Sequence, residues 1–213
     1  MSLSINHGIR FEAVNTSEIK HSYTDFGLIL TNQDIETPEP KTYTVSINGR
    51  DGDIDLTEAF GEVKFGNRTL KFTFECIEGL SQWETRKTQV ANFLHGQKMK
   101  ITTWSDYNYY YAGRCTVDEY NSSKSQGTIV ITCDCEPYKY KHNTTTFNLV
   151  SGINTVTNSR MTVYADLTCT SEVTINDTVY SAGEYLKAIK LTYGTNTITS
   201  TGEAVLAYRE GDL

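Results

Sequence analysis

Two short alternating runs on either side of a glycine-rich turn, within residues 43–56, most narrowly limit what this chain can fold into. Apolar and small polar residues alternate in both runs, which is the two-residue period of a half-buried strand. The alternating apolar residues are Tyr43, Val45 and Ile47 before the turn and Ile54 and Leu56 after it. Between them, Asn48, Gly49 and Gly52 tolerate the positive φ of tight turns at low cost. The stretch therefore predicts a strand, a compact turn and a second strand.

The same alternation recurs along the chain and predicts a mainly β fold. The clearest further runs are residues 70–76, 98–104, 109–117 and 127–135. The chain also contains 14 Tyr and is rich in Thr, and both residue types favour strands over helices.

One segment departs from the strand pattern and predicts a helix over about residues 82–95. Ser81 and Glu84 have the Ser-x-x-Glu spacing of a capping box, and Gly96 follows where a C-terminal cap belongs. The apolar residues that share one face of this helix are Trp83, Val90 and Leu94. We expect that face to pack on a sheet.

A change in composition near residues 137–143 predicts a boundary between two domains. Residues 1–137 are expected to form a β-sandwich-like domain with one packed α-helix and a hairpin arm, and residues 138–144 a linker. Residues 145–213 are expected to form a small β-sandwich or jelly roll, because aromatic residues become rarer and short strands recur. The expected strands of this second domain are 147–150, 161–167, 172–175, 178–180, 188–193, 196–200 and 204–208.

Charge and hydropathy exclude several classes of protein. The net charge is -7 and no basic block stands out, so a surface that grips the phosphates of nucleic acid is not expected, although transient passage of DNA is compatible with this charge. The N-terminus lacks the features of a signal peptide, and no run approaches the roughly 18 apolar residues of a membrane helix. The chain is therefore expected to fold in a reducing cytoplasm, with its five cysteines serving as small buried apolar residues.

No motif predicts catalysis, a metal or a cofactor. Asp51, Asp53, Asp55 and Glu62 superficially resemble a calcium loop, but Leu56 stands where the sharp turn of that loop needs glycine. The four histidines are scattered, and the spacing of the cysteines does not suit zinc. Nucleophile elbows, phosphate loops and dinucleotide fingerprints are absent from the sequence. We therefore expect a protein without enzymatic activity.

An aromatic cluster and the central hairpin are the candidate contact sites. The cluster comprises Trp104, Tyr109, Tyr110 and Tyr111, with Tyr107 in the preceding turn. Three interpretations remain open for it: strand packing with one exposed edge, a contact between subunits, or a platform on which a sugar stacks. The residues expected to mediate self-assembly through the hairpin and the adjoining segment 57–65 are Asn48, Gly49, Arg50, Asp51, Gly52, Phe60 and Phe65.

Four segments, taken together, resemble the distal tail protein (Dit) family of long-tailed, non-contractile bacteriophages of Gram-positive hosts. They are His21-Ser22-Tyr23-Thr24-Asp25-Phe26-Gly27-Leu28, then Val45-Ser46-Ile47-Asn48-Gly49-Arg50-Asp51-Gly52 with Asp55-Leu56, then Asn67-Arg68-Thr69-Leu70-Lys71-Phe72-Thr73-Phe74, and Cys133-Asp134-Cys135-Glu136-Pro137-Tyr138-Lys139-Tyr140. The final residues 208–213 also suit the C-terminal strand of that family. The resemblance rests on the order and spacing of these segments across the first 140 residues. The second domain matches only in position and in its richness in strands.

The resemblance implies a structural role in the virion at the tip of the phage tail, after synthesis in the cytoplasm of the bacterial host. It implies a homo-hexameric ring that joins the major tail protein to the tail-associated lysin or fibre protein and leaves a channel for DNA. It also implies that the C-terminal domain is galectin-like and projects outward. The alternative is a carbohydrate-binding module that recognises host saccharide through Trp104 and residues 109–111.

Overall fold

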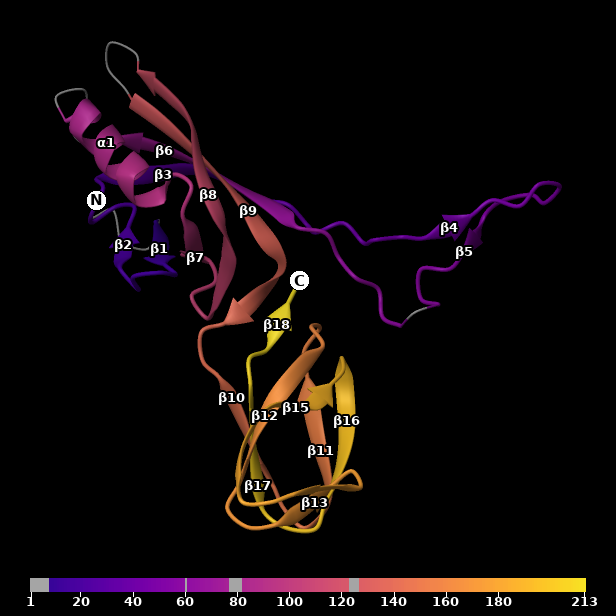
Figure 1. Cartoon of the computed structure of the whole chain (residues 1–213). Helices are drawn as coiled ribbons and strands as arrows, with labels where there is room; N and C mark the ends of the chain where they lie inside the picture. Colours follow the sequence, from indigo (N-terminus) through magenta and orange to yellow (C-terminus); the bar gives the residue numbers. More distant parts are fainter. Residues whose placement is uncertain (1–7, 60, 77–81, 123–126) are drawn as a thin grey trace. The chain divides into compact units, whose positions relative to one another are not determined.

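The structure is a computed structural model that describes residues 8–59, 61–76, 82–122 and 127–213 (Figure 1). It confirms the mainly β fold class, with one helix among the described residues. The chain divides into two compact units: unit 1 is residues 1–107 and 111–137, and unit 2 is residues 108–110 and 138–213. Strands β8 and β9 contribute residues to both units, and β9 includes residues 138–141 of the segment predicted as a linker.

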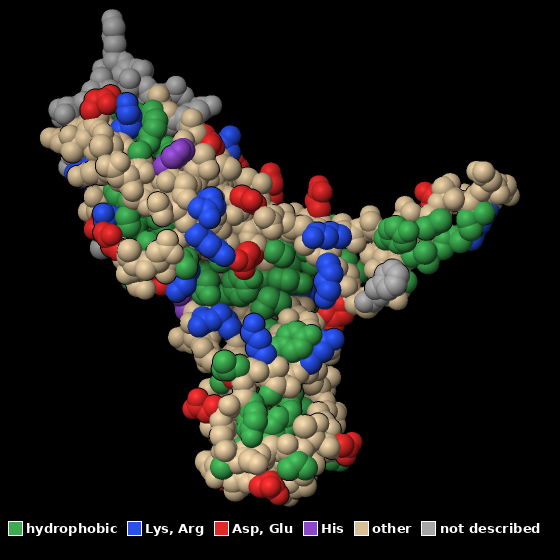
Figure 2. Space-filling model, viewed as in Figure 1, with side chains coloured by type: hydrophobic (Ala, Val, Ile, Leu, Met, Phe, Trp, Pro, Cys, Tyr) green, Lys and Arg blue, Asp and Glu red, His purple; other side chains and the backbone are tan. Residues whose placement is uncertain are grey.

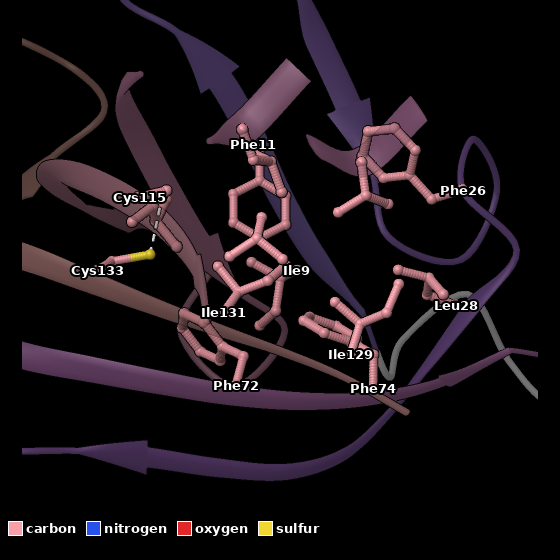
Figure 3. Packing of buried hydrophobic residues seen from close by; sticks show 14 of the residues in the cluster. Ile9, Phe11, Phe26, Leu28, Phe72, Phe74, Cys115, Ile129, Ile131 and Cys133 are labelled. Carbon is pink, nitrogen blue, oxygen red and sulfur yellow. Dashed lines mark hydrogen bonds between the residues drawn. The ribbon is translucent and has the colours of Figure 1, made fainter. Parts of the chain in front are cut away.

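One continuous sheet forms the core of unit 1, with strand order β2-β1-β7-β8-β9-β6-β3. The bounds are β1 (Ile9–Ala13), β2 (Ile19–His21), β3 (Leu28–Ile35), β6 (Arg68–Cys76), β7 (Lys98–Thr103), β8 (Tyr109–Ser122) and β9 (Gly127–Lys141). β6 shows why these segments are strands: every second side chain from Arg68 to Cys76 is buried, and the others are half-buried or exposed. Figure 3 shows the resulting core, in which Phe72 and Phe74 of β6 meet Ile129 and Ile131 of β9.

The helix α1 (Trp83–Leu94) packs on this core as expected, because Trp83, Val90 and Leu94 are all buried. Its N-cap is Gln82, whose side chain makes no capping hydrogen bond; Ser81 of the predicted capping box lies outside the described residues. At the other end, Gly96 has a φ of +75° and donates its N–H to the Cys115 carbonyl of β8. With 12 residues, α1 is too short and too polar to cross a membrane, and the described residues contain no helix that could.

A half-buried histidine, His21, is expected to make the stability of unit 1 depend on pH. Burial lowers the pKa of His21, and the nearby Asp25 carboxylate opposes this effect only in part. Its Nδ1 accepts the Tyr23 N–H at 3.3 Å, while Nε2 is buried without a hydrogen-bond partner among the described residues. The folded state therefore disfavours the protonated ring.

Because the unfolded chain binds this proton more readily, stability is complete above the ordinary histidine pKa of 6.5 and is lost as the pH falls below it. We expect the midpoint of urea unfolding, followed by tryptophan fluorescence, to decrease between pH 7.5 and pH 5.5. His21→Asn keeps an oxygen acceptor for the Tyr23 N–H and should flatten this pH dependence, whereas His142→Gln in unit 2 should leave it unchanged. An equally steep dependence in His21→Asn would assign the effect to other groups.

Two four-stranded antiparallel sheets form unit 2 and share one core. One sheet has the order β10-β17-β12-β15 and the other β11-β16-β13-β14. The bounds are β10 (Thr145–Leu149), β11 (Gly152–Asn158), β12 (Val163–Cys169), β13 (Val173–Ile175), β14 (Thr178–Tyr180), β15 (Gly183–Leu191), β16 (Gly194–Ser200) and β17 (Ala204–Tyr208). The final strand, β18 (Gly211–Asp212), pairs instead with Tyr140 and Lys139 of β9.

Strand β11 is not among the strands predicted from the sequence, because its inward side chains are mostly polar. Its inward positions are Asn154, Val156 and Asn158, so two of the three buried side chains are polar. Asn154 exchanges hydrogen bonds with the Val150 backbone, and its amide also donates to the Gly152 carbonyl. The Asn158 amide donates to the Met161 carbonyl at 2.8 Å. Because hydrogen-bonded amides occupy two of its buried positions, β11 lacks the apolar alternation by which strands are predicted from sequence.

Candidate assembly surface

Residues 36–67, here called the arm, extend the pairing of β3 with β6 into a ribbon of two antiparallel segments of this chain (Figure 1). β3 and β6 pair as far as Ile35 and Leu70. Beyond them, three backbone hydrogen bonds continue the ribbon: Glu36 N–H to the Thr69 carbonyl (3.0 Å), Gly66 N–H to the Glu39 carbonyl (2.9 Å) and Lys41 N–H to the Lys64 carbonyl (2.7 Å). The arm is therefore an ordered continuation of a core strand pair rather than an irregular loop.

Farther along the arm, the hairpin predicted from residues 43–56 forms, with shorter strands than expected. β4 (Thr44–Val45) pairs with β5 (Ile54–Asp55). Tyr43 continues this pairing, since its carbonyl accepts the Leu56 N–H at 2.8 Å and its own N–H donates to the Thr57 hydroxyl at 3.0 Å. The Thr57 hydroxyl and N–H also hold the pKa of the Asp55 carboxyl below its ordinary value. These contacts fix the register of the hairpin.

That register gives the hairpin one apolar face and one polar face. Val45 lies directly opposite Ile54, and Tyr43 lies opposite Leu56, so these four side chains share one face, here called the apolar face. Thr44 and Asp55 pair on the other face.

The prediction of a half-buried first strand is wrong, because this strand is largely exposed. Tyr43 is 57% exposed, and Ile47, two residues beyond Val45, is 46% exposed. Figure 2 shows hydrophobic side chains along the arm where packing on a core was expected.

The predicted self-assembly residues take different places in the arm. Asn48, Gly49, Arg50, Asp51 and Gly52 are all exposed at the hairpin turn, and both glycines have positive φ values, of +86° and +73°. Phe65 is half-buried and forms an isolated bridge with Pro40. Phe60 lies outside the described residues.

A hollow of about 620 Å³ opens beside the hairpin. Its lining includes Pro40, Leu56, Ala59 and Val63, together with the polar side chains of Thr42 and Glu58. The arm therefore offers a partly exposed apolar face next to a hollow partly lined by apolar side chains, which is an arrangement suited to receiving another polypeptide.

The aromatic cluster does not form an exposed platform. Trp104 is 39% exposed, but Tyr110 and Tyr111 are 9% and 7% exposed. The Tyr110 ring packs against Tyr140, with ring centroids 5.6 Å apart, and against the His142 ring at 5.1 Å. Two of the four predicted contact residues are therefore committed to packing within the chain.

The other packing contacts agree with this conclusion. Tyr111 lies beneath the Arg68 guanidinium, whose carbon is 5.4 Å from the ring centroid. Tyr109 donates its hydroxyl to the Asp212 carboxylate at 2.9 Å, and the Lys139 ammonium lies 4.7 Å from its ring centroid. The interpretation of these tyrosines as strand packing, with limited exposure, fits the contacts best.

Unit 2 contains a second hollow, of about 370 Å³, between β10, β12 and β17. Its polar lining comprises Asn148, Thr168, Thr170 and Glu203, and its described lining includes no aromatic ring on which a sugar could stack. No group of three or more His, Cys, Asp or Glu side chains in the described ranges could hold a metal ion.

Comparison with known proteins identifies a shared fold. No family model and no curated protein matches the sequence. The chain is similar to the crystal structure described as "SPP1 Dit (gp 19.1) Protein, a Paradigm of Hub Adsorption Apparatus in Gram-positive Infecting Phages", with a TM-score of 0.70. The two chains are 13% identical, and the match covers 96% of this chain and 99% of the other. The resemblance expected from the sequence is confirmed at the level of the fold.

Proposed function

We propose that this chain is a structural protein of a bacteriophage tail, forming the hub at the distal end of the tail tube. The observation that carries the proposal is the match to the SPP1 Dit fold over 96% of the chain, which includes both units. A match of this extent covers the folds of both units, and not only one common sandwich. The proposed location is the virion tail tip, and the proposed role requires no catalysis.

The arm supports assembly by an argument independent of the match. A two-stranded hairpin is marginally stable by itself in water, and an apolar face that remains exposed gains nothing from burial. On the apolar face of the hairpin, Tyr43 is exposed and Val45, Ile54 and Leu56 are only half-buried. Covering it with a neighbouring copy would bury apolar surface and hold the hairpin in place. Repetition of that head-to-tail contact forms a ring when the rotation between successive copies closes.

We further propose that the ring is a homo-hexamer with a channel for DNA, joining the major tail protein to the tail-associated lysin or fibre protein. Six copies would together carry six times the net charge of -7. An acidic channel wall repels the DNA phosphates and so prevents the DNA from adhering during its passage. The galectin-like identity of unit 2 and its outward projection belong to the same proposal.

Electron microscopy of the purified full chain, with light scattering for mass, tests this function. We expect six-fold rings and a mass six times the 24.0 kDa of one chain, with the ring fraction rising with concentration. A chain that remains monomeric at the highest soluble concentration, and that binds neutral glycans less well after Trp104→Ala, would favour the carbohydrate-binding alternative. Release of sugars or peptides from purified cell wall would contradict a purely structural role.

A further inference from the structure

Two buried thiols meet between β8 and β9, the two longest strands among the described residues. Cys115 of β8 and Cys133 of β9 are both 0% exposed, and their Sγ atoms lie 2.8 Å apart. Figure 3 shows the pair beside the core of unit 1, with a dashed line that runs from the Cys133 sulfur to Cys115. Both cysteines are free thiols in this structure. A disulfide bond is about 2.05 Å long, so the sulfurs need to approach by only roughly 0.8 Å more to form one.

The backbone geometry around the pair also suits a disulfide. A Cβ atom added to Gly113 of β8 would lie 2.7 Å from the Cys135 Cα of β9, so the two strands approach closely at this point. On adjacent antiparallel strands, a step of two residues on each side leads from Gly113 and Cys135 to Cys115 and Cys133, and the pair type is preserved. The backbone N–H and carbonyl of Cys115 bond to Gln97 and Gly96, away from β9, so Cys115 and Cys133 form a narrow, non-hydrogen-bonded pair. In this pair type the Cα atoms are about 4.5 Å apart, which lies within the range that disulfides span.

We infer that Cys115 and Cys133 are a site of oxidative modification, at which a peroxide converts the two thiols into a disulfide that joins β8 to β9. The Cys115 sulfur loses its proton and attacks the peroxide O–O bond, which gives a sulfenic acid and one water. The Cys133 sulfur then loses its proton and attacks the Cys115 sulfur, so that the S–S bond forms and a second water leaves. The two cysteines together lose two electrons, and one hydrogen peroxide is reduced to two waters.

Burial is expected to make this oxidation slow, because the thiolate is the form that attacks a peroxide. Burial and the adjacent Cys115 raise the pKa of the Cys133 thiol well above its ordinary value, so few thiolates form there. Cys135 is a competing partner on the same face of β9, and burial raises its thiol pKa as well. The short separation of Cys115 and Cys133 selects those two for the bond. This inference holds whether or not the chain forms a tail hub.

The test compares the purified full chain after hydrogen peroxide with the same chain kept in a phosphine reductant. Intact mass should fall by about 2 Da, the mass of two hydrogens, and free thiols should fall from five to three. Peptide mapping should find a single link from Cys115 to Cys133. The apparent Tm of unit 1 should rise by roughly 5–10 °C, and reduction should reverse every change.

Matched variants make the result specific. After hydrogen peroxide, Cys169→Ala, in unit 2, should still lose two free thiols. Cys133→Ala should form no disulfide within the chain and so should lose no thiols in that way. Should Cys133→Ala fail to fold, peptide mapping of the unchanged chain still decides the question. The inference fails if the native chain keeps all five thiols under conditions that oxidise the urea-unfolded chain. It also fails if the link joins other cysteines or if sulfinic acid accumulates in place of a disulfide.

Discussion

The double variant Tyr43→Asp, Val45→Asp is expected to stay monomeric at concentrations where the unchanged chain forms rings. Both side chains lie on the apolar face of the hairpin, so the proposed contact between copies would have to desolvate two carboxylates without a partner. A penalty of about 3 kcal/mol or more at one contact weakens that contact by a factor of roughly 100 or more. Sedimentation velocity across a concentration series measures the loss directly.

The polar face of the same strand provides the control. Thr44→Asp, Ser46→Asp adds the same two charges to adjacent positions, which are exposed on the hairpin. Aspartate is equally unfavourable to strand formation in both variants, so a difference between them reports the face that is covered and not the strand propensity. We expect assembly within a few-fold of the unchanged chain for this control. Equal loss of rings in both variants, or in neither, would mean that the apolar face is not the contact.

The sequence predicted the hairpin but not the exposure of its first strand, and the reason is general. Alternation of apolar and polar residues records which face of a strand is covered, without stating what covers it. In β6 the cover is the core of unit 1, and Phe72 and Phe74 are fully buried. In the hairpin the same pattern leaves Tyr43 more than half exposed. Alternation of apolar and polar residues therefore looks the same in an exposed hairpin as in a strand of the core.

Contacts between distant residues account for the other differences. The run Tyr109-Tyr110-Tyr111 shows strand propensity, but the burial of Tyr110 depends on Tyr140 and His142, some thirty residues away in sequence. Likewise, the sequence predicted buried cysteines and all five are buried, yet the meeting of Cys115 with Cys133 depends on the register between β8 and β9. Local patterns specify elements, whereas side-chain partners follow from strand register that a single sequence does not display.

Phe72→Ala is expected to remove a large part of the stability of unit 1. The side chain is fully buried, lies opposite Ile131 of β9, and has its ring centroid 6.3 Å from that of Phe74 (Figure 3). Truncating such a phenylalanine costs about 3–5 kcal/mol, because transfer energy is lost and a cavity remains. Domains of this size have a total stability of about 5–15 kcal/mol. We expect the urea midpoint of unit 1 to fall sharply.

Because the two units have separate cores, Phe72→Ala should destabilise unit 1 alone, and tryptophan fluorescence can measure this. Both tryptophans of the chain, Trp83 and Trp104, belong to unit 1, so their fluorescence follows that unit, while far-ultraviolet circular dichroism follows both. Leu206→Ala, fully buried in the core of unit 2, should cost about 2–5 kcal/mol and shift only the transition that fluorescence does not detect. If Leu206→Ala moved the fluorescence transition by as much as Phe72→Ala does, the two units would unfold as one. The two buried clusters share no residue, so we expect Phe72→Ala to leave the unit 2 transition in place.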